Sequence, residues 1–190
     1  MIHRAVIVGA VLSLGSMSGN VMAGLTEGAY AGIQYALFDL SADGISESFG
    51  PTGLIGRAGS NLNQYISIEG RLGIGLSDDT ITVTDGVTTA SVTVELDTLI
   101  GLYGVGRVPL GKSSSVYALV GLTQVDATVS APAAGPGFAP VSDDEADVSY
   151  GIGADIGILY NLYVNVEYVQ YIDKSDFDFS AVALGVKFGF

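Results

Sequence analysis

Apolar residues occupy every second position along several stretches of the chain. In the last of these stretches, the apolar side chains are Val182, Leu184, Val186, Phe188 and Phe190. Residues 64–77 show the same two-residue period, with Glu69 and Arg71 on the polar side. Because successive side chains of a strand point to opposite faces, both stretches predict β-strands with one apolar and one polar face.

The same period predicts eight strands in all. They cover residues 28–38, 51–59, 64–77, 91–108, 115–128, 147–158, 161–172 and a C-terminal strand that ends at Phe190. Short turns are expected near residues 59–64, 109–115 and 158–161, and longer polar loops at 39–50, 78–90, 129–146 and 172–177. Strict alternation of short and long connections is typical of transmembrane barrels, whose periplasmic turns are short. We therefore expect an all-β, eight-stranded antiparallel up-and-down transmembrane β-barrel with both ends in the periplasm.

Two parts of the pattern are less regular. In residues 91–108, the period places Leu96 on the outer face and Glu95 and Asp97 on the inner face. Residues 115–128 are apolar at both parities until the polar positions near their end, so the period assigns no face to this strand.

Tyr and Phe residues gather near the predicted strand ends, with Phe38 and Phe179 among those at the outer side. Stacking against a ligand is one interpretation of these rings. Belts at the membrane interface are the more common role of aromatic residues in such positions, and we expect that role here.

The N-terminus has the three parts of a secretory signal peptide. Met1–Arg4 is positively charged, residues 5–14 are apolar, and small residues precede Gly24. The apolar run is too short for a transmembrane helix, which needs about 20 residues. We expect cleavage after Ala23, which gives a signal peptide of residues 1–23 and an outer-membrane barrel domain of residues 24–190.

The segments QYISIEGRLGIGL (64–76) and ALGVKFGF (183–190) resemble the outer-membrane β-barrel domain family, which includes the transmembrane domain of OmpA and the compact OmpX-type proteins. The resemblance covers residues 24–190 and implies a Gram-negative outer-membrane location. The C-terminal Phe190 and its alternating apolar neighbours are similar to the signal that the barrel insertion machinery reads. Because the chain ends at Phe190, we expect no peptidoglycan-binding domain of the OmpA kind.

Composition narrows the possible chemistry. The only histidine is His3, within the expected signal peptide, and the chain contains no cysteine. A Ser-His-Asp triad and thiolate sites therefore cannot form in the barrel domain. We expect no enzymatic activity and no cofactor. The net charge is −13, with no basic face, so nucleic acid is not an expected partner.

Charged residues on the inward parity form the main candidate site. They are Arg57, Glu69, Arg71, Arg107, Asp155, Glu167 and Lys187. One interpretation is a charged constriction that selects ions. The other is a salt-bridged plug, which the width of an eight-stranded barrel favours because side chains alone can fill it. We predict one connected network with Glu69 and Arg71 near its centre.

Acidic residues dominate the predicted loops. Solubility and charge repulsion at the cell surface account for them most simply. A weaker candidate is a Ca²⁺ or Mg²⁺ site at Asp143, Asp144 and Glu145, because hard cations prefer carboxylate oxygens. The sequence thus predicts a structural or surface-interaction platform, and the alternative is a small porin-like diffusion channel. Its expected partners are outer-membrane lipid, the insertion machinery and an unknown extracellular molecule.

Overall fold

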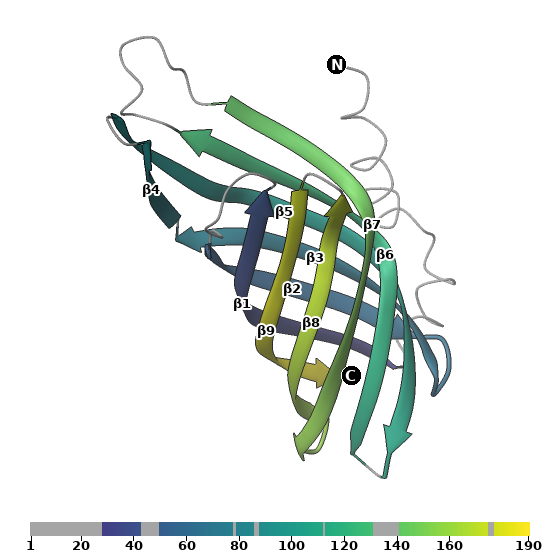
Figure 1. Ribbon diagram of the computed structural model, residues 1–190. Helices are drawn as coiled ribbons and strands as arrows, with labels where there is room; N and C mark the ends of the chain where they lie inside the picture. Colours follow the sequence, from purple (N-terminus) through teal and green to yellow (C-terminus); the bar gives the residue numbers. More distant parts are fainter. Residues whose placement is uncertain are drawn as a thin grey trace.

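The computed structural model of the chain describes residues 28–42, 50–77, 79–85, 88–111, 113–130, 141–174 and 177–190. Every regular element in these ranges is a β-strand (Figure 1). The strands are β1 (Ala29–Ala42), β2 (Thr52–Asn61), β3 (Ile66–Ser77), β4 (Asp79–Asp85), β5 (Thr88–Leu110), β6 (Ser114–Ser130), β7 (Val141–Leu159), β8 (Leu162–Lys174) and β9 (Phe177–Gly189). The expected signal peptide lies outside the described residues.

The strands close into a barrel. Except for β3 and β4, consecutive strands pair antiparallel with each other, and β1 pairs with β9 from Tyr30↔Gly189 to Ala42↔Phe177. Both β3 and β4 pair with β5, one after the other along the same edge, so together they form one strand of the wall. The nine labelled segments therefore make an eight-stranded ring, and the predicted antiparallel barrel is confirmed. No helix in the described residues combines the length and apolar character that a membrane crossing requires.

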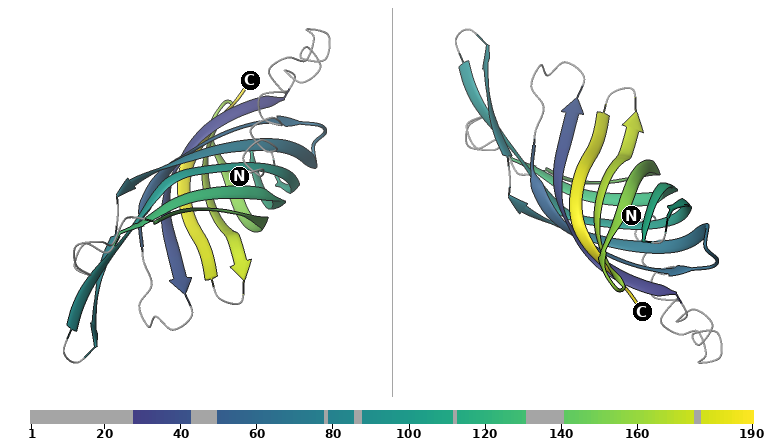
Figure 2. Two further views of the ribbon diagram at one scale, coloured as in Figure 1. Left: turned by 90° about the horizontal axis from the view of Figure 1, so that it is seen from above. Right: turned by 90° about the horizontal axis from the view of Figure 1, so that it is seen from below.

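The two ends of the barrel differ. The turn end carries the connections β2–β3, β5–β6 and β7–β8, and the loop end carries the remaining connections. On the side formed by β4 to β7, the wall extends beyond the ends of β1, β8 and β9 at the loop end (Figures 1 and 2). β5 has 23 residues and β7 has 19, whereas β1 has 14 and β9 has 13.

This extension corrects the predicted loop at residues 78–90. Most of that range belongs to β4 and to the start of β5, which pair from Asp79↔Val94 to Asp85↔Thr88. The segment between Asp79 and Asp85 is rich in Thr and β-branched apolar residues, which favour strands even outside a membrane. The predicted loop 129–146 is shortened in the same way, because β7 already begins at Val141.

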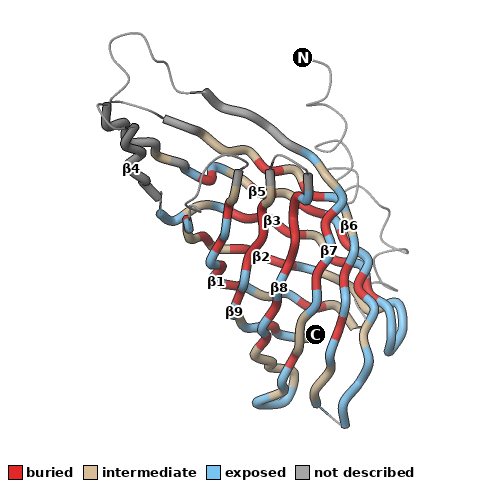
Figure 3. Tube along the Cα trace, in the orientation of Figure 1, coloured by how far each residue is buried: buried red, intermediate tan, exposed pale blue. Residues whose placement is uncertain are grey.

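Side chains alternate between an apolar outer face and a filled interior (Figure 3). On the outside, Leu184 is 61% exposed and Ile152 is 65% exposed. On the inside, Glu69 is completely buried and Arg71 is 2% exposed. An apolar exterior suits hydrocarbon, where a charged side chain would cost several kilocalories.

One stretch of β5 reverses the predicted faces. Leu96 is 4% exposed and points inward, whereas Glu95 and Asp97 are exposed. The pairing with β6 shifts register between Leu96 and Thr98, and such a bulge moves the following side chains to the opposite face. The prediction for these three residues was wrong because a two-residue period cannot anticipate an inserted residue.

Candidate functional site in the barrel lumen

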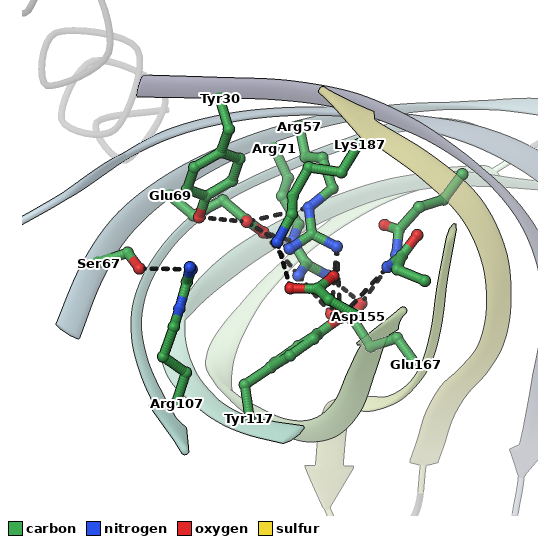
Figure 4. A network of polar contacts seen from close by, with 12 residues as sticks. Tyr30, Arg57, Ser67, Glu69, Arg71, Arg107, Tyr117, Asp155, Glu167 and Lys187 are labelled. Carbon is green, nitrogen blue, oxygen red and sulfur yellow. Dashed lines mark hydrogen bonds and ion pairs between the residues drawn. The ribbon is translucent and has the colours of Figure 1, made fainter. Parts of the chain in front are cut away.

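Four buried charges form a closed ring in the turn-end half of the lumen (Figure 4). Glu69 binds Arg57 at 2.6 Å and Arg71 at 2.7 Å. Glu167 lies 2.5 Å from Arg71 and 3.8 Å from Arg57. Positive and negative groups therefore alternate around the ring, and its formal charge is zero.

The ring joins parts of the wall that do not pair with each other. Glu69 and Arg71 lie two residues apart on β3, so they share a face, and Arg57 projects from the adjacent strand β2. Glu167 comes from β8, which two strands, β1 and β9, separate from β2. An ion pair this deeply buried contributes little net stability compared with apolar packing, but it is costly to break, because the remaining charge is then stranded.

Two tyrosines complete the hydrogen bonding of the ring. The Tyr30 hydroxyl donates to Glu69 Oε2 at 2.7 Å, and the Tyr117 hydroxyl donates to Glu167 Oε2 at 2.8 Å. A third tyrosine, Tyr103, lies with its ring 4.8 Å from the guanidinium of Arg71. The two hydroxyl groups give the carboxylate oxygens of Glu69 and Glu167 further hydrogen bonds beside those from the arginines. A buried ionic group needs such additional partners.

Glycines on the inner face make room for the tyrosine rings. A Cβ built on Gly153 would lie 2.5 Å from Cζ of Tyr117, and one on Gly59 would lie 2.6 Å from Cζ of Tyr30. Real Cβ atoms do not approach other heavy atoms so closely. The high glycine content therefore has a local reason at these two positions, because the neighbouring aromatic ring occupies the space of a side chain.

The remaining three predicted lumen charges lie outside the ring. Lys187 forms an ion pair with Asp155, and Arg107 donates from Nη2 to Ser67 Oγ at 2.7 Å. Among the described residues, neither hydrogen bonds nor ion pairs join these groups to the ring. The sequence predicted one network of seven charges, and the structure divides them into three groups.

Tyr30 lies between the three groups. Its ring centre is 6.0 Å from the guanidinium carbon of Arg57, 5.8 Å from that of Arg107 and 5.0 Å from Nζ of Lys187. Cations at such distances are attracted to the face of an aromatic ring. The sequence analysis gave Tyr30 no role; its position four residues before the buried Gln34 on β1, on the same face of the strand, was the available signal.

The loop-end half of the lumen contains a cluster of buried aromatic rings. The rings of Phe38 and Phe179 stack at 5.2 Å, and Tyr171 lies 5.7 Å from Phe179 and 6.2 Å from Phe38. All three are at most 3% exposed, and buried Leu99 and Ile172 belong to the same cluster. The expected interfacial role of Phe38 and Phe179 was therefore wrong. Phe38 shares the inward parity of Tyr30, which the argument from strand ends overlooked.

The weak metal candidates Asp143, Asp144 and Glu145 belong to β7 by backbone pairing, Asp144 opposite Asp126 of β6. Their side chains lie outside the described part of the structure. Within that part, no three His, Cys, Asp or Glu residues are grouped closely enough to hold a metal ion.

A closed eight-stranded wall, an apolar exterior and a side-chain-filled interior together limit the possible families. A family model described as the outer membrane protein beta-barrel domain matches residues 9–190. The chain belongs to this outer-membrane β-barrel family. Membership implies a lipid environment and the outer membrane of a Gram-negative cell.

Solved outer-membrane proteins share the fold. Ail, the attachment invasion locus protein of Yersinia pestis, is 18% identical with a TM-score of 0.58, and the match covers 86% of this chain and 99% of Ail. Neisserial surface protein A is 12% identical with a TM-score of 0.58, covering 85% and 97%. The N-terminal barrel of Pseudomonas aeruginosa OprF is 14% identical with a TM-score of 0.50, covering 84% and 97%. The search of curated proteins found no match. At such identities the structures show a common fold alone.

Proposed function

We propose that this barrel is a non-conducting anchor in the outer membrane, which carries an interaction surface on the outside of the cell. The observation that carries the proposal is the filling of the lumen by two successive layers. The ring of Arg57, Glu69, Arg71 and Glu167 occupies the turn-end half, and the Phe38, Tyr171 and Phe179 cluster occupies the loop-end half. An ion would have to pass both a tightly paired charge layer and an apolar layer, and neither offers it ligands.

The interaction surface would be the loop end, with the turn end and both chain ends in the periplasm. Support comes from the wall of β4 to β7, which extends beyond the rest of the barrel. Within the described residues, β4 pairs only with β5, so its other edge has no strand beside it. An open edge can add an extended segment of another protein through main-chain hydrogen bonds.

The charge of the loop end limits the class of molecule that it can bind. All charged side chains that the structure describes at the loop end are acidic: Asp39, Glu95, Asp97, Asp126, Asp147, Asp173 and Asp178. Ail was crystallised with the heparin analogue sucrose octasulfate, a polyanion. An acidic surface repels such a ligand, so we infer that the extracellular partner of this chain is a basic protein segment, held by complementary charge and sensitive to salt.

Two measurements test the proposal together. The purified barrel, reconstituted into planar bilayers, is expected to show no stable unitary conductance. Cells that display it are expected to retain a basic extended peptide such as oligo-lysine, and to release it as salt rises. A variant with Asp97, Asp126 and Asp147 changed to Asn keeps the size of these side chains and should lose most of the retention.

Stable single-channel currents would overturn the sealed-anchor proposal in favour of a small diffusion channel. Equal peptide retention by the parent and the Asn variant would overturn the acidic interaction surface and leave the barrel itself as the only supported role. The two failures are separate, because one concerns the lumen and the other the loop end.

A further inference from the structure

At the bulge of β5, the pattern of the sequence and the packing of the structure favour opposite faces. The two-residue period of the chain assigns Leu96 to the outer face and Glu95 and Asp97 to the inner face. In the structure Leu96 is 4% exposed, and both acidic residues are exposed. The reversal occurs at Asp97, the one residue that the ladder with β6 skips between Leu96 and Thr98. A conflict of this kind indicates two arrangements that lie close in free energy.

Three contacts favour the observed register. Leu96 belongs to the loop-end cluster of buried apolar residues. The hydroxyl of Thr128 donates to Oδ2 of Asp97 at 2.7 Å. Gly75 of β3 leaves room for the main chain of Leu96, because a Cβ at Gly75 would collide with the Leu96 carbonyl oxygen. The first two contacts depend directly on the bulge, which turns Leu96 inward and Asp97 outward.

The bulge has a partner strand on one side only. β3 pairs with β5 as far as Ile74↔Thr98, and β4 begins to pair with β5 at Asp79↔Val94. In the described pairing, residues 95–97 therefore have no ladder on the side of β3 and β4 that would hold their register. The two exposed carboxylates of this segment also carry like charges, and their repulsion opposes the observed register.

We propose that the upper part of β5 (residues 88–96) exchanges between two registers against β6, one with the bulge and one without it. In the second register, Glu95 moves from its place opposite Thr128 to a place opposite Val129. A shift by one residue turns every side chain of the shifted part to the other face. Leu96 then points outward and the two carboxylates point inward, as the period of the sequence predicts.

The register determines whether the acidic outer face of the loop end is complete. With the bulge, Glu95 and Asp97 are displayed on β5 beside the neighbouring strand that carries Asp126, and without the bulge both are withdrawn. A basic partner on this face binds the bulged register more strongly and shifts the population toward it. This consequence rests on the proposed function, whereas the exchange of registers does not.

Disulfide trapping tests the exchange directly, because the chain has no cysteine and each introduced pair is unique. Glu95→Cys with Thr128→Cys places the two sulfurs side by side in the observed register. Glu95→Cys with Val129→Cys does so only in the second register, since in the observed one these side chains point to opposite faces and cannot be bridged. Glu95→Cys with Ala127→Cys is the matched control, displaced by one residue in the other direction.

The pairs are compared in the folded chain in detergent under a mild oxidant, with mass-tagged free thiols as the readout. The Thr128 pair should close first. The Val129 pair should also close, about tenfold or more slowly, as expected for a minor state of at most about 10%. The Ala127 pair should stay open. Equal closure of the Val129 and Ala127 pairs would indicate undirected fraying and overturn the inference, and so would a Val129 pair that stays open.

Two substitutions should shift the exchange toward the second register. Gly75→Ala presses on the Leu96 carbonyl and should speed closure of the Val129 pair about fivefold or more, the factor for an overpacking cost of about 1 kcal/mol. Leu96→Ala removes the buried side chain and should act in the same direction. Gly106→Ala is the control, because a Cβ there meets no atom within 4 Å.

The heat-modifiable mobility of the barrel on gels reports whether each variant is folded. If Gly75→Ala does not fold, Leu96→Ala still tests the inference. Closure of the Val129 pair that the folded variants leave unchanged would overturn it.

Oligo-lysine connects the exchange with the acidic face. It should slow closure of the Val129 pair, because Asp97 and Asp126 remain in that variant and attract it in the bulged register, and added salt should remove the effect. Closure that oligo-lysine does not slow would overturn the connection with a basic partner. Trapping itself needs no partner, so a failure of the proposed function and a failure of the register exchange are distinguishable.

Discussion

The guanidinium of Arg71 donates two hydrogen bonds to the carboxylate of Glu167, at 2.5 and 2.7 Å, although 96 positions separate the two residues in the chain. Both groups are almost completely buried. The bidentate geometry fixes the distance between β3 and β8 across the lumen, where no backbone hydrogen bond acts. The pair can form only after the barrel has closed, so it reports on the complete fold.

Arg71→Leu is expected to lower the free energy of unfolding by about 3–5 kcal/mol, because it strands the carboxylates of Glu69 and Glu167 away from water. Arg107→Leu is the matched control, since Arg107 has no carboxylate partner in the described chain, and its effect should be clearly smaller. Urea unfolding in detergent, followed by circular dichroism, measures both. Equal midpoint shifts would contradict a paired plug and favour a water-filled lumen.

Replacing both members of the pair should cost less than replacing one. In Arg71→Met with Glu167→Met, no charge of this pair remains to be stranded, and two flexible apolar side chains fill similar space. We expect the double variant to be more stable than the less stable of the two single variants. A double-mutant cycle from the same urea curves gives the coupling energy. Simple additivity of the two single effects would show that the groups do not interact.

Gly153→Ala should destabilise the barrel by about 1–3 kcal/mol, the range for overpacking a filled interior. The added Cβ would lie 2.5 Å from the ring of Tyr117 and would displace it from Glu167. Gly106→Ala is the control, because a Cβ there meets no atom within 4 Å. Thermal unfolding followed by gel mobility compares the two. A larger loss for Gly106→Ala would show that strand propensity, and not ring packing, determines the effect.

Phe179→Ala should reduce stability by about 3–5 kcal/mol, as large truncations in a packed core do. It removes one of the stacked rings of the loop-end cluster. Phe188→Ala, on the same strand but with its ring on the outer face, is the matched control and should cost less in detergent. If both variants unfold at the same urea concentration, the loop-end cluster does not stabilise the barrel more than an outer-face ring does.

Removal of Phe190 should strongly decrease the amount of barrel in the outer membrane. The alternating apolar residues Val182, Leu184, Val186, Phe188 and Phe190 would form the insertion signal, and the Phe190 amide also donates to the Ala29 carbonyl at 2.8 Å, where the barrel closes. Membrane fractionation of cells measures the loss, and refolding of the same variant in detergent separates a targeting defect from an unstable barrel. Normal outer-membrane levels would contradict this expectation.

Where the wall strands were regular, the sequence determined their faces. A strand turns its side chains by half a revolution per residue, so the parity of Glu69, Arg71 and Glu167 placed them inside without knowledge of any contact. The number of barrel strands followed from the same period and from the alternation of connections. The hydrocarbon surroundings make this pattern strict, because polar groups on the outer face are costly.

Only the tertiary structure determined the faces of the irregular stretches and the pairing of charges across the lumen. The bulge beside Leu96 reversed the faces of Glu95 and Asp97, and residues 115–128 gained an inner face only because Tyr117 fits against Gly153 and reaches Glu167. The pairing of Arg71 with Glu167 likewise depends on the height of each residue in the closed barrel. Strand tilt and stagger set those heights when the last strand joins the first, and no segment of the chain carries that information alone.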